Sequence, residues 1–362
     1  MDHRRSLVAC RQPVSQNNGP TEGNRQSAPV SVSDAGEFAL IARVVTRLRS
    51  PGPPAGPGDD AAVVPAPSGD VIATTDLLVE GRHFRFDWSS PYDVGRKAAA
   101  QSLADVAAMG ATPTALLIGL ACPSATPIEI VDGVADGLRD ECALVGATIV
   151  GGDMVSASEI CLAVTALGDL AGCAPLTRAG ARPGESVVLA GTVGRSAAGL
   201  DLLLAGVRDG PLVAAHRRPS PPYAAGPALA RAGASSLVDV SDGLLADLGH
   251  VATASGVVFE VDVAALSALV PGVGVRHLLT GGEDHGLVGT LPAGAAVPAG
   301  VAVIGRVLPA GSSRPGEPAG STRAGVRLVG DDIPPDLRDP QLDGLAASDA
   351  TGTPRGWDHF RR

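Results

Sequence analysis

The pattern that most constrains the fold is a repeated alternation of short apolar runs with longer helical segments along most of the chain. The runs at 114–121 and 160–167 have the length and the aliphatic content of buried strands. The Ala-rich segments 91–109 and 126–145 have helical spacing, so a mixed α/β fold is predicted. Further strands are expected at 61–64, 71–75, 147–150, 186–190, 236–240, 257–261, 286–290 and 301–307, and further helices near 195–205, 222–232 and 243–254.

The length of 362 residues predicts two domains, because one domain typically takes roughly 100 to 200 residues. A turn at Arg182-Pro183-Gly184 opens the second series of strands and helices, so the boundary is expected shortly before it. Residues 1–33 lack periodicity. The predicted organisation is a disordered extension at 1–33, an N-terminal α/β domain at 34–172, a C-terminal α/β domain at 173–330 and a C-terminal tail at 331–362.

The chain is acidic, with a formal net charge of −10 from 38 acidic and 28 basic residues. Proteins that hold nucleic acid by neutralising its phosphates need the opposite balance, which argues against a nucleic-acid partner. An acidic protein that handles phosphate groups usually does so through bound metal ions, whose charge inverts the local electrostatics. We therefore look for metal ligands rather than for a basic patch.

Cysteine usage and hydropathy favour a cytoplasmic protein. The five cysteines form no CxxC pair and no spacing typical of a metal site, as is common in a reducing compartment. No uninterrupted apolar run reaches the ~18 residues that a membrane-spanning helix needs, and the N-terminus lacks the apolar centre of a signal peptide. We expect no membrane partner.

Lys97 is the only lysine in the chain, and Ala98 follows it. A GxxxxGK[ST] phosphate loop is therefore absent from the sequence. The protein-kinase motifs are excluded as well, since they need a strand lysine and a catalytic H-R-D loop. Two large classes of phosphoryl-transfer protein are thus ruled out.

Aspartates recur where predicted strands end or where glycines make a turn. Magnesium prefers oxygen ligands in near-octahedral geometry and normally shares its shell among one or two carboxylates, waters and substrate phosphates. Scattered aspartates therefore suit several Mg²⁺ ions that bridge a polyphosphate, with the hydroxyls of Thr74, Thr75 and Ser241 as further ligands. The candidate aspartates are Asp60, Asp76, Asp105, Asp153, Asp239 and Asp242.

Each candidate is also compatible with a purely structural role. Gly-Asp-Asp and Ser-Asp-Gly are common turn sequences, and Asp242 before a helix is typical of an N-cap. Asp105 is compatible with a solvated helix position, and Glu283 with a charged turn. His83 and Arg178 are equally compatible with surface residues. A separate structural explanation for each residue is plausible, but so many independent explanations become implausible when the motifs are considered together.

Long stretches around these residues match one known family in both sequence and order. The segments are 36–38, 58–62, 75–84, 102–110, 151–153, 176–178, 218–221, 240–244, 281–284 and 357–360. They closely resemble the thiamine-monophosphate kinase family, over about residues 36 to 308 and a final patch at 356–360. The wider superfamily, which resembles aminoimidazole ribonucleotide synthetase, shares the aspartates. The segment at 36–38, His83 and the terminal patch favour the thiamine branch.

The resemblance implies a two-domain, aminoimidazole ribonucleotide synthetase-like α/β fold, with strands of the N-terminal domain pairing across a homodimer and ATP in the cleft. It implies magnesium ligands at Asp60, Thr74, Thr75, Asp76, Asp105, Asp153, Asp239 and Asp242. It implies ATP contacts at Gly152, Asp153, Arg178 and Ser241, and substrate contacts at His83, Glu283 and Trp357. His285-Gly286 departs from the Tyr-Glu that is common in the family.

The reaction implied by the resemblance is transfer of the γ-phosphoryl group of ATP directly to thiamine monophosphate, with no acid–base or nucleophilic residue. Two alternatives differ from it. One is another ATP-dependent synthetase of the same superfamily, acting on a formyl-amidine or making selenophosphate. The other is a nucleotide-binding regulator without turnover, which would be expected to have lost several of the aspartates that are present here.

Overall fold

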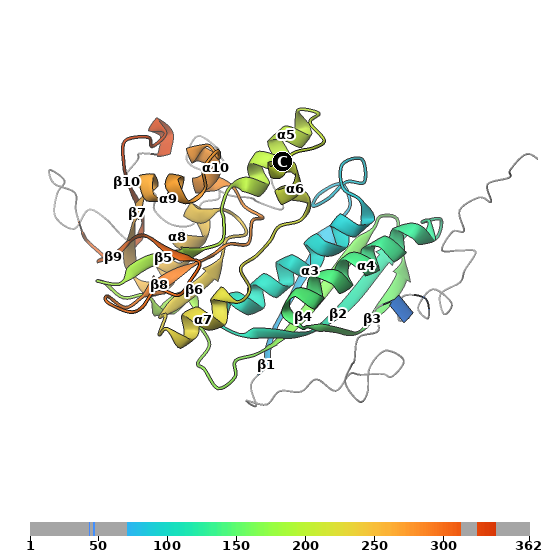
Figure 1. Cartoon of the computed structure of the whole chain (residues 1–362), viewed down its shortest axis with the longest axis horizontal. Helices are drawn as coiled ribbons and strands as arrows, with labels where there is room; N and C mark the ends of the chain where they lie inside the picture. Colours follow the sequence, from blue (N-terminus) through green and yellow to red (C-terminus); the bar gives the residue numbers. More distant parts are fainter. Residues whose placement is uncertain (1–42, 44–45, 48–70, 313–323, 338–362) are drawn as a thin grey trace, which may run out of the picture.

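The computed structural model describes residues 43, 46–47, 71–312 and 324–337 (Figure 1). These residues form two β-sheets, each with its own helices, which lie side by side. Several expectations fall outside the described residues: the extension at 1–33, the strand at 61–64, Asp60, Trp357 and most of the tail from 331. The mixed α/β class predicted from the sequence is confirmed.

The first sheet has four strands in the order β1-β4-β2-β3. Strand β4 is antiparallel to both of its neighbours, and β2 and β3 are parallel. In β4 every second side chain is buried, including Leu162, Val164 and Ala166, because successive side chains point to opposite faces of a sheet. The strands are β1 (Val71–Val79), β2 (Thr112–Cys122), β3 (Thr148–Ser156) and β4 (Cys161–Asp169).

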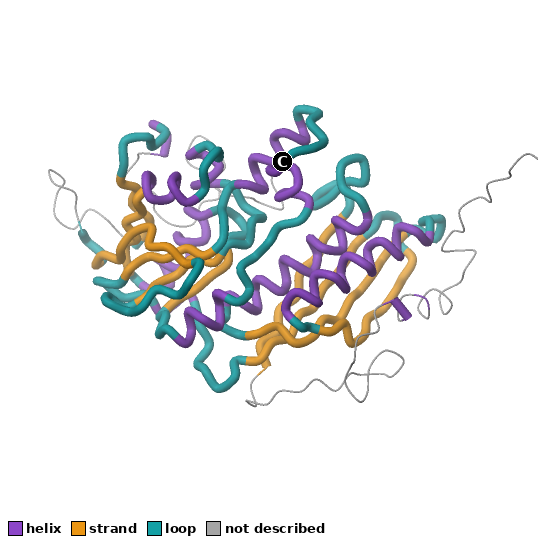
Figure 2. Tube along the Cα trace, viewed as in Figure 1, coloured by secondary structure: helices purple, strands orange, loops and turns teal. Residues whose placement is uncertain are grey.

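Helices α3 (Pro91–Ala108) and α4 (Ile128–Val145) cover one face of this sheet (Figure 2). Helix α3 begins with a capping box, in which Ser90 and Asp93 satisfy each other's backbone N–H groups. The two helices approach closely at Gly95 and Gly137, where an added Cβ atom would collide with the carbonyl oxygen of the opposite helix. Small residues at the crossing therefore set how deeply α3 lies in the fold.

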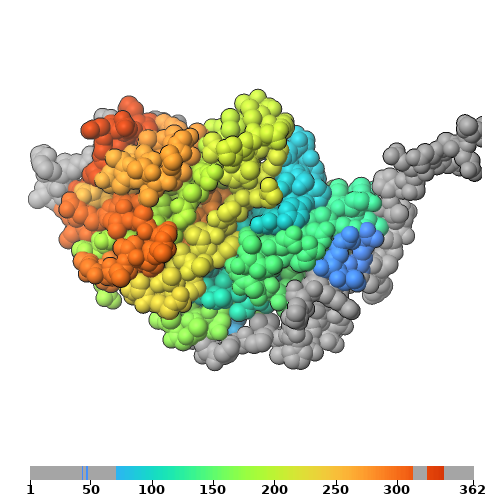
Figure 3. Space-filling view, viewed as in Figure 1, coloured from blue at the N-terminus to red at the C-terminus, as the bar shows by residue number. Residues whose placement is uncertain are grey.

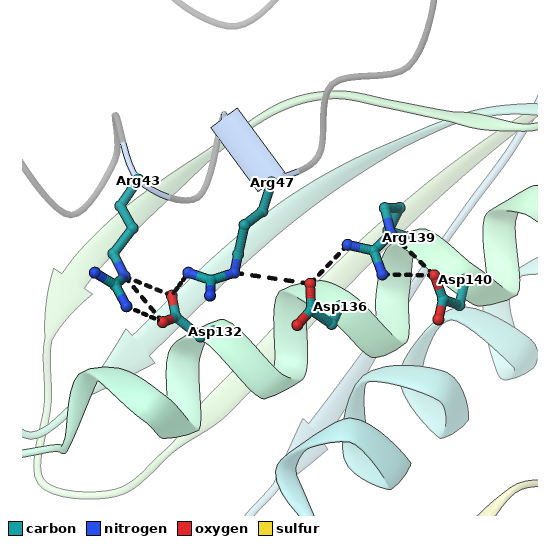
Figure 4. Close-up of polar contacts among 6 residues, drawn as sticks. All are labelled: Arg43, Arg47, Asp132, Asp136, Arg139 and Asp140. Carbon is teal, nitrogen blue, oxygen red and sulfur yellow. Dashed lines mark hydrogen bonds and ion pairs between the residues drawn. The ribbon is translucent and has the colours of Figure 1, made fainter.

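Ion pairs line the outer side of α4 (Figure 4). Arg43 and Arg47, from the segment before the first sheet, both pair with Asp132, and the Nε atom of Arg47 lies 3.7 Å from Asp136. Arg139 continues the row along the helix surface to Asp136 at 2.6 Å and to Asp140 at 2.7 Å. The row thus joins Arg43 and Arg47 to the surface of α4.

The second sheet has six strands in the order β10-β7-β9-β5-β8-β6. The only parallel pair among them is β10 with β7, and the other described neighbours are antiparallel. The strands are β5 (Ser186–Ala190), β6 (Ser236–Asp239), β7 (Val257–Asp262), β8 (Leu287–Leu291), β9 (Val301–Pro309) and β10 (Gly325–Val329). The accompanying helices are α5 (Arg195–Leu204), α6 (Pro211–Arg217), α7 (Ala225–Arg231), α8 (Leu244–Ser255), α9 (Val263–Leu269) and α10 (Val275–Thr280).

The two halves share a buried surface along α3, and the space-filling view shows them in direct contact (Figure 3). The core of the first sheet includes Leu237 of β6 and Leu287 of β8. Gly226 of α7 lies against the carbonyl group of Ala107, so closely that a Cβ atom would not fit. The C-terminal half of α3 is therefore held against the second sheet.

The sequence located α3, α4, α5, α7, α8 and strands β2 to β9, and it missed other short elements. Helices α6, α9 and α10 have only six or seven residues, fewer than two full turns, which leaves little helical periodicity. Strand β10 was missed although strands as short as it, β5 and β8, were located. Strand β1 continues to Val79, beyond the expected end at 75. No helix among the described residues is long and apolar enough to cross a membrane.

Candidate active site

Carboxylates from both sheets meet at the C-terminal half of α3. Asp76 comes from β1, Asp105 from α3 and Asp239 from the end of β6. Burial, and after it the charges of Asp239 and Asp76, raise the pKa of Asp105 to about 7, against the opposing hydrogen bond from Thr74. A carboxyl group on a buried helix thus lies between carboxylates contributed by the two halves of the molecule.

Neighbouring side chains hold two of these carboxylates in place. Asp76 accepts hydrogen bonds from Gln101 at 2.9 Å and from Ser102 at 2.7 Å, one for each carboxylate oxygen. Thr74 donates to Asp105 at 2.8 Å. Thr74 and Asp76 share the helix-covered face of β1 because they are two residues apart. The intervening Thr75 lies on the opposite face, where it accepts a hydrogen bond from Thr165 at 3.0 Å.

Asp239 is paired with a buried histidine, His285. The Nδ1 atom of His285 lies 2.9 Å from Asp239, and both side chains are buried. Burial lowers the pKa of His285, but the bond to Asp239 and its charge outweigh this effect and leave that pKa raised. The Nε2 atom of His285 is buried and has no hydrogen-bond partner in the described part of the chain.

Two loops of the second half are fastened together beside this cluster. The backbone N–H of Glu283 donates to the carbonyl of Ser241 at 2.9 Å, and that of His285 donates to Val240 at 3.1 Å. Glu283 and His285 both have positive φ values, 64° and 54°, a region that costs free energy for residues other than glycine. These bonds hold the loop in that conformation, so the positions of Glu283 and Ser241 depend on each other.

Asp247 of α8 holds the turn that carries Asp242. It accepts hydrogen bonds from the backbone N–H groups of Asp242 and Gly243, both at 3.1 Å. Its side chain is buried, and this burial, with the charges of Asp239 and Asp242, raises its pKa well above the usual value. Sequence analysis did not select Asp247, although an acidic residue in the first turn of a predicted helix was visible.

Lys97 connects two of the predicted substrate contacts. Its Nζ atom lies 3.2 Å from both carboxylate oxygens of Glu283 and donates to the carbonyl of His83 at 3.1 Å. Burial raises the pKa of Glu283, but the charges of Lys97 and His216 prevail and leave that pKa lowered. Burial, and after it the charge of Lys97, lower the pKa of His216 to about 4, although the charge of Glu283 opposes them. Lys97 was noted in the sequence only as the sole lysine.

His83 itself is oriented by the backbone of β1. The N–H group of Val79 donates to its Nδ1 atom at 2.9 Å, so a neutral ring carries its proton on Nε2. Its backbone carbonyl faces Lys97, and Lys97 in turn faces Glu283. His83 and Glu283, which are 200 positions apart in the sequence, are thus brought to the same lysine.

The structure separates the predicted ATP contacts on the first sheet from the carboxylate cluster. Gly152 and Asp153 lie on β3, and β3 and β1 form opposite edges of the sheet. Three strand spacings of about 4.8 Å place Asp153 roughly 14 Å from β1, too far to share one ion with Asp76. Asp153 accepts a hydrogen bond from the N–H of Met154 at 2.9 Å. The carbonyl of Arg178 accepts one from Ser255 at 2.7 Å.

The donor atoms at the cluster suit a hydrated magnesium ion. In the part of the chain that is described, no three His, Cys, Asp or Glu side chains form a ready-made metal site. The donors near Asp105 are carboxylate and hydroxyl oxygens, which Mg²⁺ prefers, and it commonly binds through only one or two carboxylates. After burial, the charges of Asp239 and Asp76 contribute to the raised pKa of Asp105, and a cation would relieve this repulsion.

Comparison with known proteins gives the family. Residues 58–170 match the family described as AIR synthase related protein, N-terminal domain. A thiamine-monophosphate kinase from Mycobacterium tuberculosis is 46% identical over 290 residues, covering 77% of this chain and 86% of the relative. The chain belongs to the thiamine-monophosphate kinase family.

Solved structures of this family share the fold. The thiamine-monophosphate kinase from Stenotrophomonas maltophilia K279a superposes with a TM-score of 0.67 at 31% identity, covering 82% of this chain and 98% of that one. The structure of AaThiL complexed with AMPPCP and TMP superposes with a TM-score of 0.65 at 29% identity, covering 90% of this chain and 98% of that one. The aminoimidazole ribonucleotide synthetase-like fold expected from the sequence is thus confirmed.

Proposed function

We propose that the protein transfers the γ-phosphoryl group of ATP to thiamine monophosphate, giving ADP and thiamine diphosphate. The observation that carries this proposal is the meeting of Asp76, Asp105 and Asp239, in a member of this family. An oxygen of the acceptor phosphate forms a bond to the γ-phosphorus while the bond to the β-phosphate oxygen breaks. No covalent enzyme intermediate is required.

Magnesium would supply charge neutralisation in this site. Two unit charges ~4 Å apart repel by about 4 kcal/mol at an effective dielectric constant of 20, so two approaching phosphates need compensating cations. Thr74 and the bonds from Gln101 and Ser102 hold the carboxylates of Asp105 and Asp76 ready for such ions. The ligands we propose at this cluster are Asp60, Thr74, Asp76, Asp105, Asp239 and Asp242. Thr75, on the opposite face of β1, and Asp153, at the other edge of the sheet, are proposed as ligands of further ions.

The remaining residues bind and orient the two substrates. The acceptor phosphate is already anionic near neutral pH, so a general base is unnecessary and positioning supplies much of the rate. Glu283, held by Lys97, and His83 are proposed to contact the thiamine part, together with Trp357. Gly152, Asp153, Arg178 and Ser241 are proposed to contact ATP.

We further propose that the protein is a cytoplasmic homodimer with two domains per subunit, divided near residues 172–173. Among the described residues, helices cover one face of the first sheet and not the other. The other face exposes large apolar side chains: Val71 at 46%, Leu77 at 54% and Val155 at 56%. Apolar side chains gathered on an open sheet face are typical of an interface, and a second copy of this face would bury them.

The deciding experiment follows thiamine diphosphate by chromatography after purified protein is mixed with ATP, Mg²⁺ and thiamine monophosphate. Thiamine and a formyl-amidine ribonucleotide serve as control acceptors. We expect thiamine diphosphate only from the monophosphate. Absence of that product, with ATP still bound, would overturn the thiamine assignment and leave only the fold.

A further inference from the structure

A polar cavity lies at the other end of α3 and is lined by residues of α3, α5 and α6. Figure 1 shows where these three helices lie. Its volume is about 310 Å³, within the range of small-ligand pockets. Three arginines from three different elements line it: Arg96 from α3, Arg195 from the start of α5 and Arg218 from the loop after α6. Thr192 and Ser220 add hydroxyl groups.

The three guanidinium groups differ in how far they are already engaged. The side chain of Arg195 has no hydrogen-bond or ion-pair partner within the described ranges. Arg218 pairs with Asp93 at 3.1 Å, but its side chain is 46% exposed, and such surface pairs contribute little. Arg96 is anchored by Glu141 and Tyr92 through two of its five N–H donors. Donors therefore remain at all three positions.

The carboxylates that face these arginines do not cancel their charge. Asp284 lines the same cavity, but its carboxylate oxygens already accept hydrogen bonds within the protein. The donors are the hydroxyl of Thr192 at 3.2 Å and the backbone N–H groups of Arg195 at 3.1 Å and Ser196 at 3.0 Å. Its charge is thus balanced by the N-terminus of α5. Glu141 is buried and is not among the residues that line the cavity; it also accepts a hydrogen bond from Tyr223 at 2.6 Å.

From this geometry we propose that the cavity is a binding site for a small phosphate-type anion, separate from the proposed thiamine and magnesium sites. Guanidinium forks match the oxygens of phosphate, and three of them around one cavity give a site for a single oxyanion with its waters. A cationic thiazolium ring would be repelled there. Asp284 joins this cavity to the neighbouring Glu283, so a bound anion would contact the loop that carries a proposed substrate contact.

The test is calorimetric titration of the full chain with inorganic phosphate and, separately, with glycerol 3-phosphate, in EDTA and without nucleotide. We expect one site in the wild-type protein. Arg195→Gln should weaken binding by about tenfold to a hundredfold, the factor expected for loss of a charged hydrogen-bond donor. Arg195→Lys keeps the charge but not the fork, so its effect should be smaller. Tighter binding of the ester than of free phosphate would identify esters as the natural ligand.

Two control variants test whether phosphate binds in this cavity and nowhere else on the protein. Arg231→Gln removes another exposed arginine, at the end of α7, and should leave phosphate binding unchanged. Asp105→Asn should also leave it unchanged, because Asp105 lies nine residues from Arg96, roughly 14 Å along α3. The proposal is overturned if phosphate does not bind, if Arg195→Gln binds as tightly as wild type, or if binding responds to Asp105→Asn instead.

Discussion

The two ends of α3 present opposite charge to the rest of the molecule. Its C-terminal half places Asp105 among carboxylates from both sheets, and among the described residues the buried basic side chain that pairs with one of them is His285, which contacts Asp239. Its N-terminal half places Lys97 and Arg96 against Glu283 and Glu141, where each buried charge has a partner. An end with unmatched charge is suited to bind ions, and an end with matched charge is suited to hold loops in position.

The largest effect is expected from a substitution within the cluster of Asp76, Asp105 and Asp239. Asp105→Asn should lower kcat by about a hundredfold to a thousandfold at saturating Mg²⁺, as loss of one preorganised electrostatic group does in other enzymes. Because Asn removes repulsion with Asp76 and Asp239, the same variant should unfold at a higher denaturant concentration in EDTA. Asp136→Asn, on the surface of α4, is the matched control. A folded Asp105→Asn enzyme with near-normal kcat would contradict this role.

The second largest effect is expected at the N-terminal half of α3, where Lys97 is paired with Glu283. Lys97→Met leaves Glu283 without its cation, and loss of one partner from a buried pair costs about 3–5 kcal/mol of stability, less here because Glu283 is 25% exposed. The KM for thiamine monophosphate should rise tenfold or more, while the KM for ATP changes little. The double variant Lys97→Met/Glu283→Gln should regain stability but not the low KM. Recovery of both would show that Lys97 acts only on folding.

A smaller effect depends on pH. The pKa of His216 is about 4 in the folded protein and about 6.5 when unfolded, so the unfolded state binds more protons between these values. Stability contributed by neutral His216 is present above pH 6.5 and is lost as pH falls toward 4. Between pH 8 and pH 5 this loss should reach about 2 kcal/mol. Chemical unfolding of His216→Gln at both pH values should show a correspondingly weaker pH dependence; an unchanged dependence would exclude His216 as its source.

The smallest effect is expected on the outer row of α4. Arg139→Met removes two ion pairs that are exposed to solvent, so its unfolding free energy should change by less than about 0.5 kcal/mol. Urea unfolding at low and at high salt would measure it. A change above about 1 kcal/mol would mean that surface pairs in this protein matter more than such pairs usually do.

The sequence predicted the α/β class, and each candidate site residue was recognised from the local motif that contains it. Asp76, Asp105 and Asp239 were recognisable because their motifs, mostly strand ends and glycine turns, mark positions where side chains reach an edge of a sheet. Lys97, His216 and Asp247 were not selected, because their roles come from contacts with residues that lie elsewhere in the sequence, such as Glu283. Thr75 was selected with Thr74, yet the alternation of β1 turns its side chain to the other face.

Local sequence by itself determined the long helices, most strands and the positions of the acidic turns, since periodicity and turn chemistry act over a few residues. Only the tertiary structure decided which of these turns meet. The glycines at 95, 137 and 226 let α3 lie deep enough to touch both sheets, and that depth brings Asp105 to Asp239 and Lys97 to Glu283. Charge–charge energies depend on such distances and on burial, and neither quantity can be read from local sequence patterns.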